Sequence, residues 1–340
     1  MGEGEWNTLK RFCAFAIIEI HMKVLITGIA GFVGSHLAER LLKTGNEIFG
    51  ICLPGESLEN ISKIRRSLRL SECDITRFDQ LSRLIKRINP DQIYHLAALS
   101  SVGKSFSHPL DTIKTNIRGT LYLLEILRNL NKRVKILVVG SSDMYGKVLP
   151  KEIPITEKKP LLPISPYGVS KATCDLLAYQ YFASYRVYAI RARAFNHTGP
   201  RQRTGFVIPD FASQIAKIEV GQMPPVLKVG NLSSKRDISD VRDVVTAYLS
   251  LMGKGKAGEA YNICSREAYS IKNVLKILLS LSKKKIKVKL DEKKSRPAEI
   301  PILMGDNSKI RKAVGWKPKI PLKKTLEDTL NFWREKYKVF

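Results

Sequence analysis

Cysteine is sparse in this sequence, and long hydrophobic runs are absent. The five cysteines are odd in number, widely separated and without a Cys-x-x-Cys pair: Cys13, Cys52, Cys73, Cys174 and Cys264. Such spacing argues against a disulfide framework and against a metal site, and it favours small buried thiols in a reducing, cytoplasmic compartment. No apolar stretch reaches the roughly 18 uncharged residues that a membrane-spanning helix requires, so we expect no membrane partner.

Acidic residues are also scarce relative to basic ones. The chain has 58 Lys and Arg against 31 Asp and Glu, a formal net charge of +27. This balance favours polyanionic partners such as nucleic acid, anionic lipid or phosphorylated small molecules. Nucleic-acid binding usually adds interleaved aromatic residues or a recognition helix, which are missing, so we expect no nucleic-acid partner. The densest run, Lys283 to Lys289, is expected to be a solvated surface in which Ile286–Leu290 forms a half-buried strand.

Strand and helix patterns alternate along most of the chain. Apolar strand-like segments at 23–27, 47–52, 92–98, 134–140 and 186–194, with a third strand ending near Asp74, are separated by helical patterns at 78–88, 109–131 and 166–184. Alternation of this kind predicts an α/β fold with a Rossmann-like, doubly wound parallel sheet. Beyond residue 196 the pattern loosens into shorter segments, which predicts a smaller, mostly C-terminal lobe.

The predicted domain boundaries follow from this pattern. We expect a Rossmann domain mainly over residues 22–195. A binding lobe is expected mainly over 196–340, with some segments returning to the Rossmann domain. Residues 1–21 precede the first strand, and we expect Met22 to be the natural start, with the extension being upstream read-through or a loosely attached arm.

A glycine-rich turn joins the first strand to the first helix. Gly28, Gly31 and Gly34 follow the strand in the spacing G-x-x-G-x-x-G, with Phe32 and Val33 inside it. Glycines here permit a tight turn, let the backbone approach a pyrophosphate and let helix and strand pack closely, while the helix N-terminus offers free N–H groups. This position in a strand–helix unit predicts dinucleotide binding.

The choice between NAD and NADP stays open. The second strand ends in Ile51-Cys52-Leu53, which supplies neither the acidic residue that favours NAD nor the arginine that favours NADP. Arg65 and Arg66 could reach the extra phosphate, but a solvated helix face is the expected place for both.

A second constellation predicts acid–base chemistry. Tyr167 and Lys171 lie one helical turn apart, in a helix that Ser165-Pro166 opens. A lysine ammonium beside a tyrosine stabilises the phenolate, so we expect the pKa of Tyr167 to fall below its ordinary value of about 10. Ser141 ends the fifth strand, at the edge where ligands bind in open α/β sheets. Together these residues predict an enzyme; a non-catalytic sensor of nucleic acid or protein on the same fold has no need of all three.

These motifs resemble the extended short-chain dehydrogenase/reductase family of nucleotide-sugar enzymes over residues 22–338. The resemblance implies NAD or NADP as cofactor and catalytic roles for Ser141, Asp143, Tyr167 and Lys171. It implies cofactor contacts by the glycine turn with Phe32 and Val33, by Tyr167 and Lys171, and by Asp74, Ile75, Leu96, Ala97, Ala98 and Asn116. Asn116 is implied to orient Lys171 or a water molecule; the alternative is a packing or helix-bending polar residue.

Further segments are most similar to the GDP-sugar branch of this family: Phe195–Pro200, Gly205–Ala216, Gly230–Leu232, Arg236–Asp243 and Arg296–Glu299. The branch implies a GDP-linked sugar as substrate, held by Ser142, Asn196, Arg236, Arg296 and Glu299. It also implies a homodimer formed through the helices near 109–131 and 166–184.

Two reactions of this branch fit the sequence. One is NAD(P)H-dependent reduction of the 4-keto group of GDP-4-keto-6-deoxy-mannose to a GDP-6-deoxyhexose of the GDP-rhamnose type. The other is GDP-mannose 4,6-dehydration or a related epimerase or dehydratase reaction. Dehydratases usually have Gln-Asp in place of Phe32-Val33 and Glu-Ser-Pro in place of Thr198-Gly199-Pro200. Asp143 replaces the Glu usual in both, and a shorter carboxylate hinders a base more than a sugar-orienting group, which favours the reductase.

Overall fold

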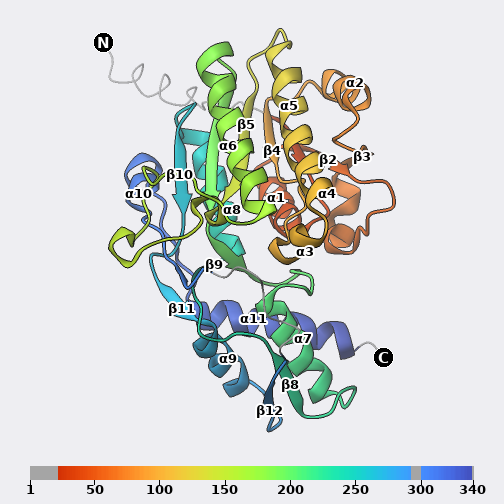
Figure 1. Cartoon of the computed structure of the whole chain (residues 1–340). Coiled ribbons are helices and arrows are strands. Elements are labelled where there is room, and N and C mark those ends of the chain that lie inside the picture. The colour runs from red at the N-terminus through yellow and green to blue at the C-terminus, as the bar shows by residue number, and fades with distance from the viewer. Residues whose placement is uncertain (1–21, 292–299, 339–340) are drawn as a thin grey trace, which may run out of the picture.

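The computed structural model describes residues 22–291 and 300–338, which form a large α/β part and a smaller part beside it (Figure 1). The large part contains a seven-stranded sheet of order β10-β6-β5-β4-β1-β2-β3 in which every neighbouring pair is parallel. Its strands are β1 (Lys23–Thr27), β2 (Glu47–Cys52), β3 (Arg69–Glu72), β4 (Gln92–His95), β5 (Lys135–Ser141), β6 (Tyr188–Ala194) and β10 (Ala260–Ile263). The predicted Rossmann-like parallel sheet is confirmed.

Helices cover both faces of this sheet because its strands are apolar on both sides. Val24 and Ile26 of β1 belong to one hydrophobic core and Leu25 to another, as alternation along a strand requires. The first core includes α1 (Phe32–Leu42), α8 (Val241–Lys254) and α10 (Ser308–Val314). The second includes α2 (Phe78–Ile88), α5 (Gly119–Arg128) and α6 (Pro166–Tyr185). The carboxyl ends of the strands therefore meet along one edge, between two helical layers.

The smaller part has a core of its own, formed by α7 (Val207–Glu219), α9 (Ile271–Ser280), α11 (Leu322–Lys338) and β8 (Val226–Val229). β8 pairs in parallel with β12 (Lys287–Leu290). A second small sheet has the order β11-β9-β13, with β7 also paired to β9; these strands are β7 (Asn196–Thr198), β9 (Lys235–Asp240), β11 (Ala268–Ser270) and β13 (Ile302–Leu303). Since α8 and β10 follow α7 and β9 in sequence, the chain leaves the large part and returns to it.

The helix predicted over 109–131 is interrupted. It consists of α4 (Pro109–Ile113), preceded by α3 (Val102–Ser107), then a π-helical turn over Lys114–Arg118, then α5. The carbonyl oxygen of Asn116 in this turn accepts hydrogen bonds from Thr120 Oγ1 at 2.8 Å and Cys174 Sγ at 3.2 Å. Side chains thus replace part of the regular backbone ladder, and π turns of this kind are frequent at functional sites.

Two predicted strands also need correction. The strand predicted over 92–98 ends at His95, because the N–H groups of Leu96 and Ala97 donate to Thr27 Oγ1 at 3.2 Å each. The strand predicted at 286–290 exists as β12, but it is not half-buried: Val288 and Leu290 are 43% and 64% exposed. It lies at the edge of a two-stranded sheet, outside the core that buries β8.

Candidate active site

The glycine turn lies at the carboxyl end of β1 and opens onto the N-terminus of α1. Gly28 has a φ of +71°, and a Cβ atom there would lie 3.0 Å from the backbone of Ala97. A Cβ atom on Gly34 would lie 2.3 Å from the carbonyl oxygen of Gly28, so strand and helix pack too closely for a side chain. Gly31 is the N-cap of α1, and no side chain caps the helix. The free N–H groups that a helix N-terminus offers, beside half-buried Phe32 and Val33, fit the pyrophosphate of a dinucleotide.

The segment after β4 is attached directly to this turn. Thr27 Oγ1 accepts from the N–H groups of Leu96 and Ala97, so its own hydrogen goes to His95 Nδ1 at 2.8 Å. His95 Nε2 then carries the ring hydrogen and donates to Thr120 Oγ1 at 3.0 Å. Leu96, Ala97 and Ala98, which the resemblance implies as cofactor contacts, are half-buried, and the backbone of Leu96 and Ala97 lies beside Gly28.

Two other predicted cofactor residues follow β3. Asp74 is half-buried, and its Oδ1 accepts from the backbone N–H and the hydroxyl of Thr76, both at 2.8 Å. Ile75 is 5% exposed, and its side chain fills the space beside Gly119. The side chain of Ile75 therefore faces the core, which leaves its backbone for any contact with a ligand.

Ser141 ends β5 and caps the one-turn 3-10 helix Ser142–Tyr145. Its Oγ accepts from the backbone N–H of Asp143 at 3.2 Å and donates to Asp143 Oδ2 at 3.1 Å. Ser142 is 1% exposed, so a substrate could contact it only after a rearrangement. The turn fixes the Ser141 hydroxyl and the Asp143 carboxylate next to each other at the carboxyl edge of the sheet.

The first turns of α6 pack against this one-turn helix. Ser165 caps α6 as predicted, its Oγ accepting from the N–H of Gly168 at 3.0 Å. Tyr167 and Lys171 are each 8% exposed, and the Lys171 ammonium donates to the carbonyl oxygen of Val139 on β5 at 2.8 Å. A hydrogen bond joins Tyr167 to the Ser141 side chain. The structure therefore brings Ser141, Asp143, Tyr167 and Lys171 together.

The expected lowering of the tyrosine pKa is wrong for this structure. Burial raises the pKa of Tyr167 above its ordinary value of 10.0, and the negative charge of Asp143 raises it further, while the hydrogen bond with Ser141 acts in the opposite direction. Burial also lowers the pKa of Lys171, so the ammonium form, which would stabilise a phenolate, is less favoured than in water. Tyr167 is thus a neutral phenol at pH 7, the form that donates a proton.

The side chain of Asn116 bonds to the loop after β4 and to α6 rather than to Lys171. Its amide oxygen accepts from the N–H of Leu99 at 2.8 Å, and its amide nitrogen donates to the Leu99 carbonyl at 3.2 Å and to Ser170 Oγ at 2.9 Å. Ser170 in turn donates to the carbonyl oxygen of Tyr167. Asn116 therefore holds the loop after β4 against the first turn of α6, which is the packing alternative.

Two of the predicted substrate residues, Asn196 and Arg236, lie on the small sheet. Asn196 is exposed on β7, opposite Ile238 of the parallel strand β9, and Arg236 precedes Ile238 by two positions. Arg236 is half-buried, and its Nη1 donates to the carbonyl oxygen of Lys235 at 2.9 Å. The strand pairing brings Asn196 and Arg236 to neighbouring positions. Arg296 and Glu299 lie outside the described residues, as do residues 1–21.

A contact between the glycine turn and the start of the small sheet was not predicted. The ring of Phe32 stacks on His197 at 6.0 Å between centroids. Arg201 Nη2 donates to His36 Nδ1 at 2.9 Å, so His36 carries its hydrogen on Nε2 and donates to the Pro200 carbonyl at 3.0 Å. Burial, with the Arg201 charge, lowers the pKa of His36 to about 4. No spacing in the sequence could have signalled a contact between residues so far apart.

A buried group of charges behind Tyr167 was also missed, although the sequence carries a signal for it. Arg191 and Arg193 lie in β6, an otherwise apolar strand, and both donate to Asp175 of α6. Charged side chains are almost never fully buried unless they are paired. Two arginines within a central strand therefore predict a buried acidic partner, which the helical spacing from Lys171 could have identified.

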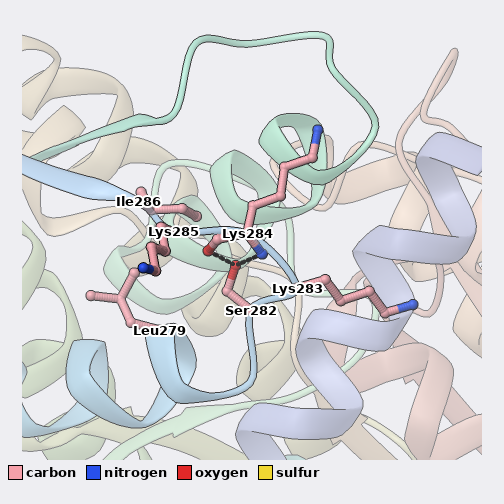
Figure 2. A pocket seen from close by; sticks show the side chains of 6 residues that line it. All are labelled: Leu279, Ser282, Lys283, Lys284, Lys285 and Ile286. Atoms are coloured by element: carbon pink, nitrogen blue, oxygen red, sulfur yellow. Dashed lines mark hydrogen bonds between the residues drawn. The ribbon is translucent and has the colours of Figure 1, made fainter.

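The lysine-rich turn after α9 is separate from this site. A cavity of about 420 Å³ is lined there by Leu279, Ser282, Lys283, Lys284, Lys285 and Ile286. Figure 2 shows that the three lysine side chains point in different directions, and Lys284 Nζ donates to the carbonyl oxygen of Ile218 at 3.1 Å. Diverging ammonium groups do not form an anion site, and the three lysines are exposed, as the solvated-surface prediction requires.

Residues 22–291 and 300–338 include no cluster of three His, Cys, Asp or Glu side chains that could hold a metal ion. None of the helices in this part of the chain is both long and apolar enough to cross a membrane. The four cysteines within it are free thiols and are buried, as predicted.

Comparison with known proteins gives one family match over most of the chain. The model of the family described as GDP-mannose 4,6 dehydratase matches residues 25–329. The GDP-6-deoxy-D-mannose reductase of Pseudomonas aeruginosa is 32% identical over 314 residues, covering 92% of this chain and 98% of the reductase. The human GDP-mannose 4,6 dehydratase is 33% identical over 327 residues, covering 87% of each chain.

Solved structures of related enzymes are also similar to this chain over most of its length. RMD from Pseudomonas aeruginosa complexed with NADPH is similar with a TM-score of 0.81 and 32% identity, covering 93% of this chain and 99% of that one. The UDP-glucose 4-epimerase of Thermotoga maritima with UDP-glucose reaches a TM-score of 0.84 at 27% identity, covering 93% of this chain and 100% of the epimerase. Both similarities extend over the large and the small part.

Proposed function

Because the chain belongs to the GDP-mannose 4,6-dehydratase family, we propose that it reduces the 4-keto group of GDP-4-keto-6-deoxy-mannose with NAD(P)H, giving a GDP-6-deoxyhexose of the GDP-rhamnose type. The observation that carries the proposal is the position of Tyr167, a buried and protonated phenol bonded to Ser141 and one helical turn from Lys171. Reduction of a ketone needs a proton donor at neutral pH. The similarity to the Pseudomonas reductase over nearly its whole length supports the same reaction.

Different residues of the chain would bind the cofactor, donate the proton and polarise the ketone. The cofactor, when bound, supplies a hydride, and Gly28, Gly31 and Gly34 would hold its pyrophosphate at the N-terminus of α1. Tyr167 donates its proton to the oxygen on carbon 4, and the Ser141 hydroxyl polarises the same oxygen by a hydrogen bond. The ammonium of Lys171 would stabilise the phenolate that remains and would bond the nicotinamide ribose of a bound cofactor.

Dehydration is the second candidate reaction, and the family match and the similarity to the human dehydratase favour it. Asp143 distinguishes the two reactions. A dehydratase must remove the proton on carbon 5, so its carboxylate has to reach that carbon. The Asp143 carboxylate accepts the Ser141 hydroxyl at 3.1 Å and is one methylene shorter than Glu. A carboxylate held there suits the orientation of a sugar hydroxyl.

The nucleotide end of the substrate is assigned to the small sheet. We propose that Arg236 pairs with the pyrophosphate, since guanidinium groups bind phosphates bidentately. Asn196, on the neighbouring strand, would contact phosphate or sugar, with Arg296, Glu299 and, after a rearrangement that exposes it, Ser142 as further contacts. We propose NADH or NADPH as the hydride donor. The Pseudomonas structure contains NADPH, whereas Leu53 at the end of β2 offers no partner to an extra phosphate.

We further propose a homodimer formed through α4 and α6. Large apolar side chains are exposed on these helices: Leu110 (81%), Ile113 (37%), Val169 (41%), Leu176 (57%) and Tyr179 (49%). Such a concentration on neighbouring helices is typical of an interaction surface. The buried free thiols of the described residues suit a reducing compartment, which supports a cytoplasmic location.

One assay tests the proposed reaction against the alternative. The protein is incubated with GDP-4-keto-6-deoxy-mannose and NADPH or NADH, and the absorbance of the reduced cofactor is followed. Separately, it is incubated with GDP-mannose without added cofactor. We expect loss of the reduced cofactor in the first mixture and no keto sugar in the second. Formation of the 4-keto-6-deoxy sugar from GDP-mannose would show that the protein is a dehydratase and not a reductase.

A further inference from the structure

The catalytic set has two halves that come from different elements. One is the turn Ser141–Tyr145 after β5, and the other is the face of α6 that carries Tyr167 and Lys171. Asp175 lies one helical turn beyond Lys171 on the same face and is 1% exposed. It accepts hydrogen bonds from β6, so the helix with the proton donor is attached to a strand of the sheet at a point behind the site.

Arg193 of β6 connects the two halves. Its Nε and Nη2 donate to the two oxygens of Asp175 at 3.0 and 2.8 Å, which is the bidentate geometry of a strong ion pair. Its Nη1 donates to the hydroxyl oxygen of Tyr145 at 3.1 Å and to the carbonyl oxygen of Glu157 at 3.0 Å. One guanidinium, itself 5% exposed, therefore binds both the tyrosine–lysine helix and the last residue of the serine turn.

The hydroxyl of Tyr145 has a fixed direction within this network. It donates to Asn262 Oδ1 at 2.6 Å while it accepts from Arg193. Burial raises the pKa of Tyr145 to about 12, so the hydroxyl keeps its hydrogen at neutral pH. Asn262 donates in turn to the carbonyl oxygen of Ile155 at 2.9 Å. Donors and acceptors match along the whole chain of contacts, which favours the observed arrangement of the turn relative to α6.

Stability alone does not account for these charges. A buried ion pair is weak evidence for stability, because the loss of hydration offsets most of the attraction, and apolar replacements are often tolerated. Asp175 also has a second cation, since Arg191 Nη1 donates to its Oδ2 at 2.8 Å. Removal of the Arg193 charge would therefore leave the buried carboxylate paired, while it would release the serine turn from α6.

We propose that Asp175, Arg193 and Tyr145 are positioning residues that hold Ser141 at a fixed distance from Tyr167. Tyr145 ends the one-turn helix that Ser141 caps, so movement of its ring moves Ser141 and Asp143 together. A misplacement of about 1 Å can lower a rate about a hundredfold. The activity readout of this proposal rests on the proposed reductase function; the geometric claim does not.

The test compares Arg193→Met with a matched substitution elsewhere. Arg334 of α11 forms the same bidentate pair, with Nε and Nη2 donating to Glu219 of α7 at 2.7 and 2.8 Å, and both residues are half-buried in the smaller part. We expect Arg193→Met to lower kcat about a hundredfold with the Kd for NADPH within about threefold, and Arg334→Met to keep kcat within about twofold. Arg193→Lys, which keeps the charge but loses the fork, should recover part of the rate.

A second measurement separates positioning from a loss of folded protein. With NADPH deuterated at the transferred position, misalignment makes the hydride step rate-limiting, so the isotope effect on kcat should rise in Arg193→Met and Tyr145→Phe and stay unchanged in Arg334→Met. Equal losses of kcat in the two methionine variants, or an unchanged isotope effect, would overturn the proposal.

Failure of the proposed function has a different signature. If the wild type turns over no keto sugar, the reductase function is wrong. The positioning role is then tested by crystal structures of the wild type and Arg193→Met. A shift of Ser141 Oγ relative to the Tyr167 oxygen of about 1 Å supports the positioning role. An unchanged distance overturns it.

Discussion

The proposed cofactor side of the site lies on successive strand–helix units of one sheet, whereas the proposed substrate side is assembled from β7, β9 and segments far apart in the chain. On the cofactor side the positions are set by backbone: Gly28 and Gly34 leave no room for a Cβ, and Thr27 binds the segment after β4. On the substrate side they are set by side chains such as Asn196 and Arg236, on strands of three and six residues. Backbone positions tolerate few substitutions, while side chains can be exchanged for another specificity.

The strongest test of this contrast is Tyr167→Phe, which removes the proton donor and leaves the backbone of the cofactor site unchanged. General acid–base groups contribute about 10²–10⁴-fold to a rate, so we expect a loss of kcat in that range. The Kd for NADPH, measured by calorimetry, should stay nearly constant. Retention of most of the turnover would show that Tyr167 is not the proton donor.

The contact between α1 and the start of the small sheet, which includes His36, predicts that the stability of the protein depends on pH. The pKa of buried His36 falls from 6.5 to about 4 on folding, so the unfolded chain binds the proton first as the pH drops. Stability from this group is present above pH 6.5 and is lost between pH 6.5 and about 4, by about 3 kcal/mol in total.

The effect is measured as the free energy of unfolding in urea at pH 7 and pH 4.5. His36→Gln can still donate to the Pro200 carbonyl but cannot take up the proton, so it should lose less stability over this range than the wild type. His108, which is exposed, provides the matched control, since His108→Gln should change the pH dependence little. Identical pH profiles for the wild type and His36→Gln would contradict the expectation.

A smaller effect is expected from Arg236→Ala on the substrate side. A hydrogen bond to a charged group contributes about 1.5–3 kcal/mol, so the affinity for the GDP-sugar should fall roughly ten- to hundredfold. The affinity for NADPH, titrated in parallel, should be unchanged, because Arg236 lies on β9 and the glycine turn on β1 and α1. Equal losses for both ligands would show that Arg236 serves the fold.

The smallest effect separates the two candidate reactions. Asp143→Asn removes the charge but keeps an oxygen that can accept from Ser141, so reduction of the ketone should stay within about tenfold of the wild type. The same substitution should abolish any dehydration, which needs the carboxylate as a base. It also removes a charge that raises the pKa of Tyr167, so this pKa should fall in the variant. A loss of reduction much larger than tenfold would contradict the orienting role.

Local patterns were sufficient for most of the sheet and for one half of the site. Apolar runs and helical spacing predicted β2 and α2 at their observed bounds, because their burial follows from periodicity alone. The π turn at Asn116 and the raised pKa of Tyr167 could not be predicted. Both depend on tertiary contacts: the first on Cys174 of another helix, the second on burial against the serine turn. The side chains that join distant segments, His36 to Arg201 and Arg193 to Tyr145, were missed for the same reason.

The place of β10 in the sheet has a consequence for synthesis of the chain. β6 is flanked by β5 on one side and by β10 on the other, and β10 is made only after α7, β9 and α8. At a translation rate of about 5–20 residues per second, the outer edge of β6 stays bare for about 3–13 s. A bare edge strand is a template for pairing with other chains. Aggregation of nascent chains should therefore be most frequent for fragments that stop between residues 195 and 259, and extension through Ile263 should suppress it.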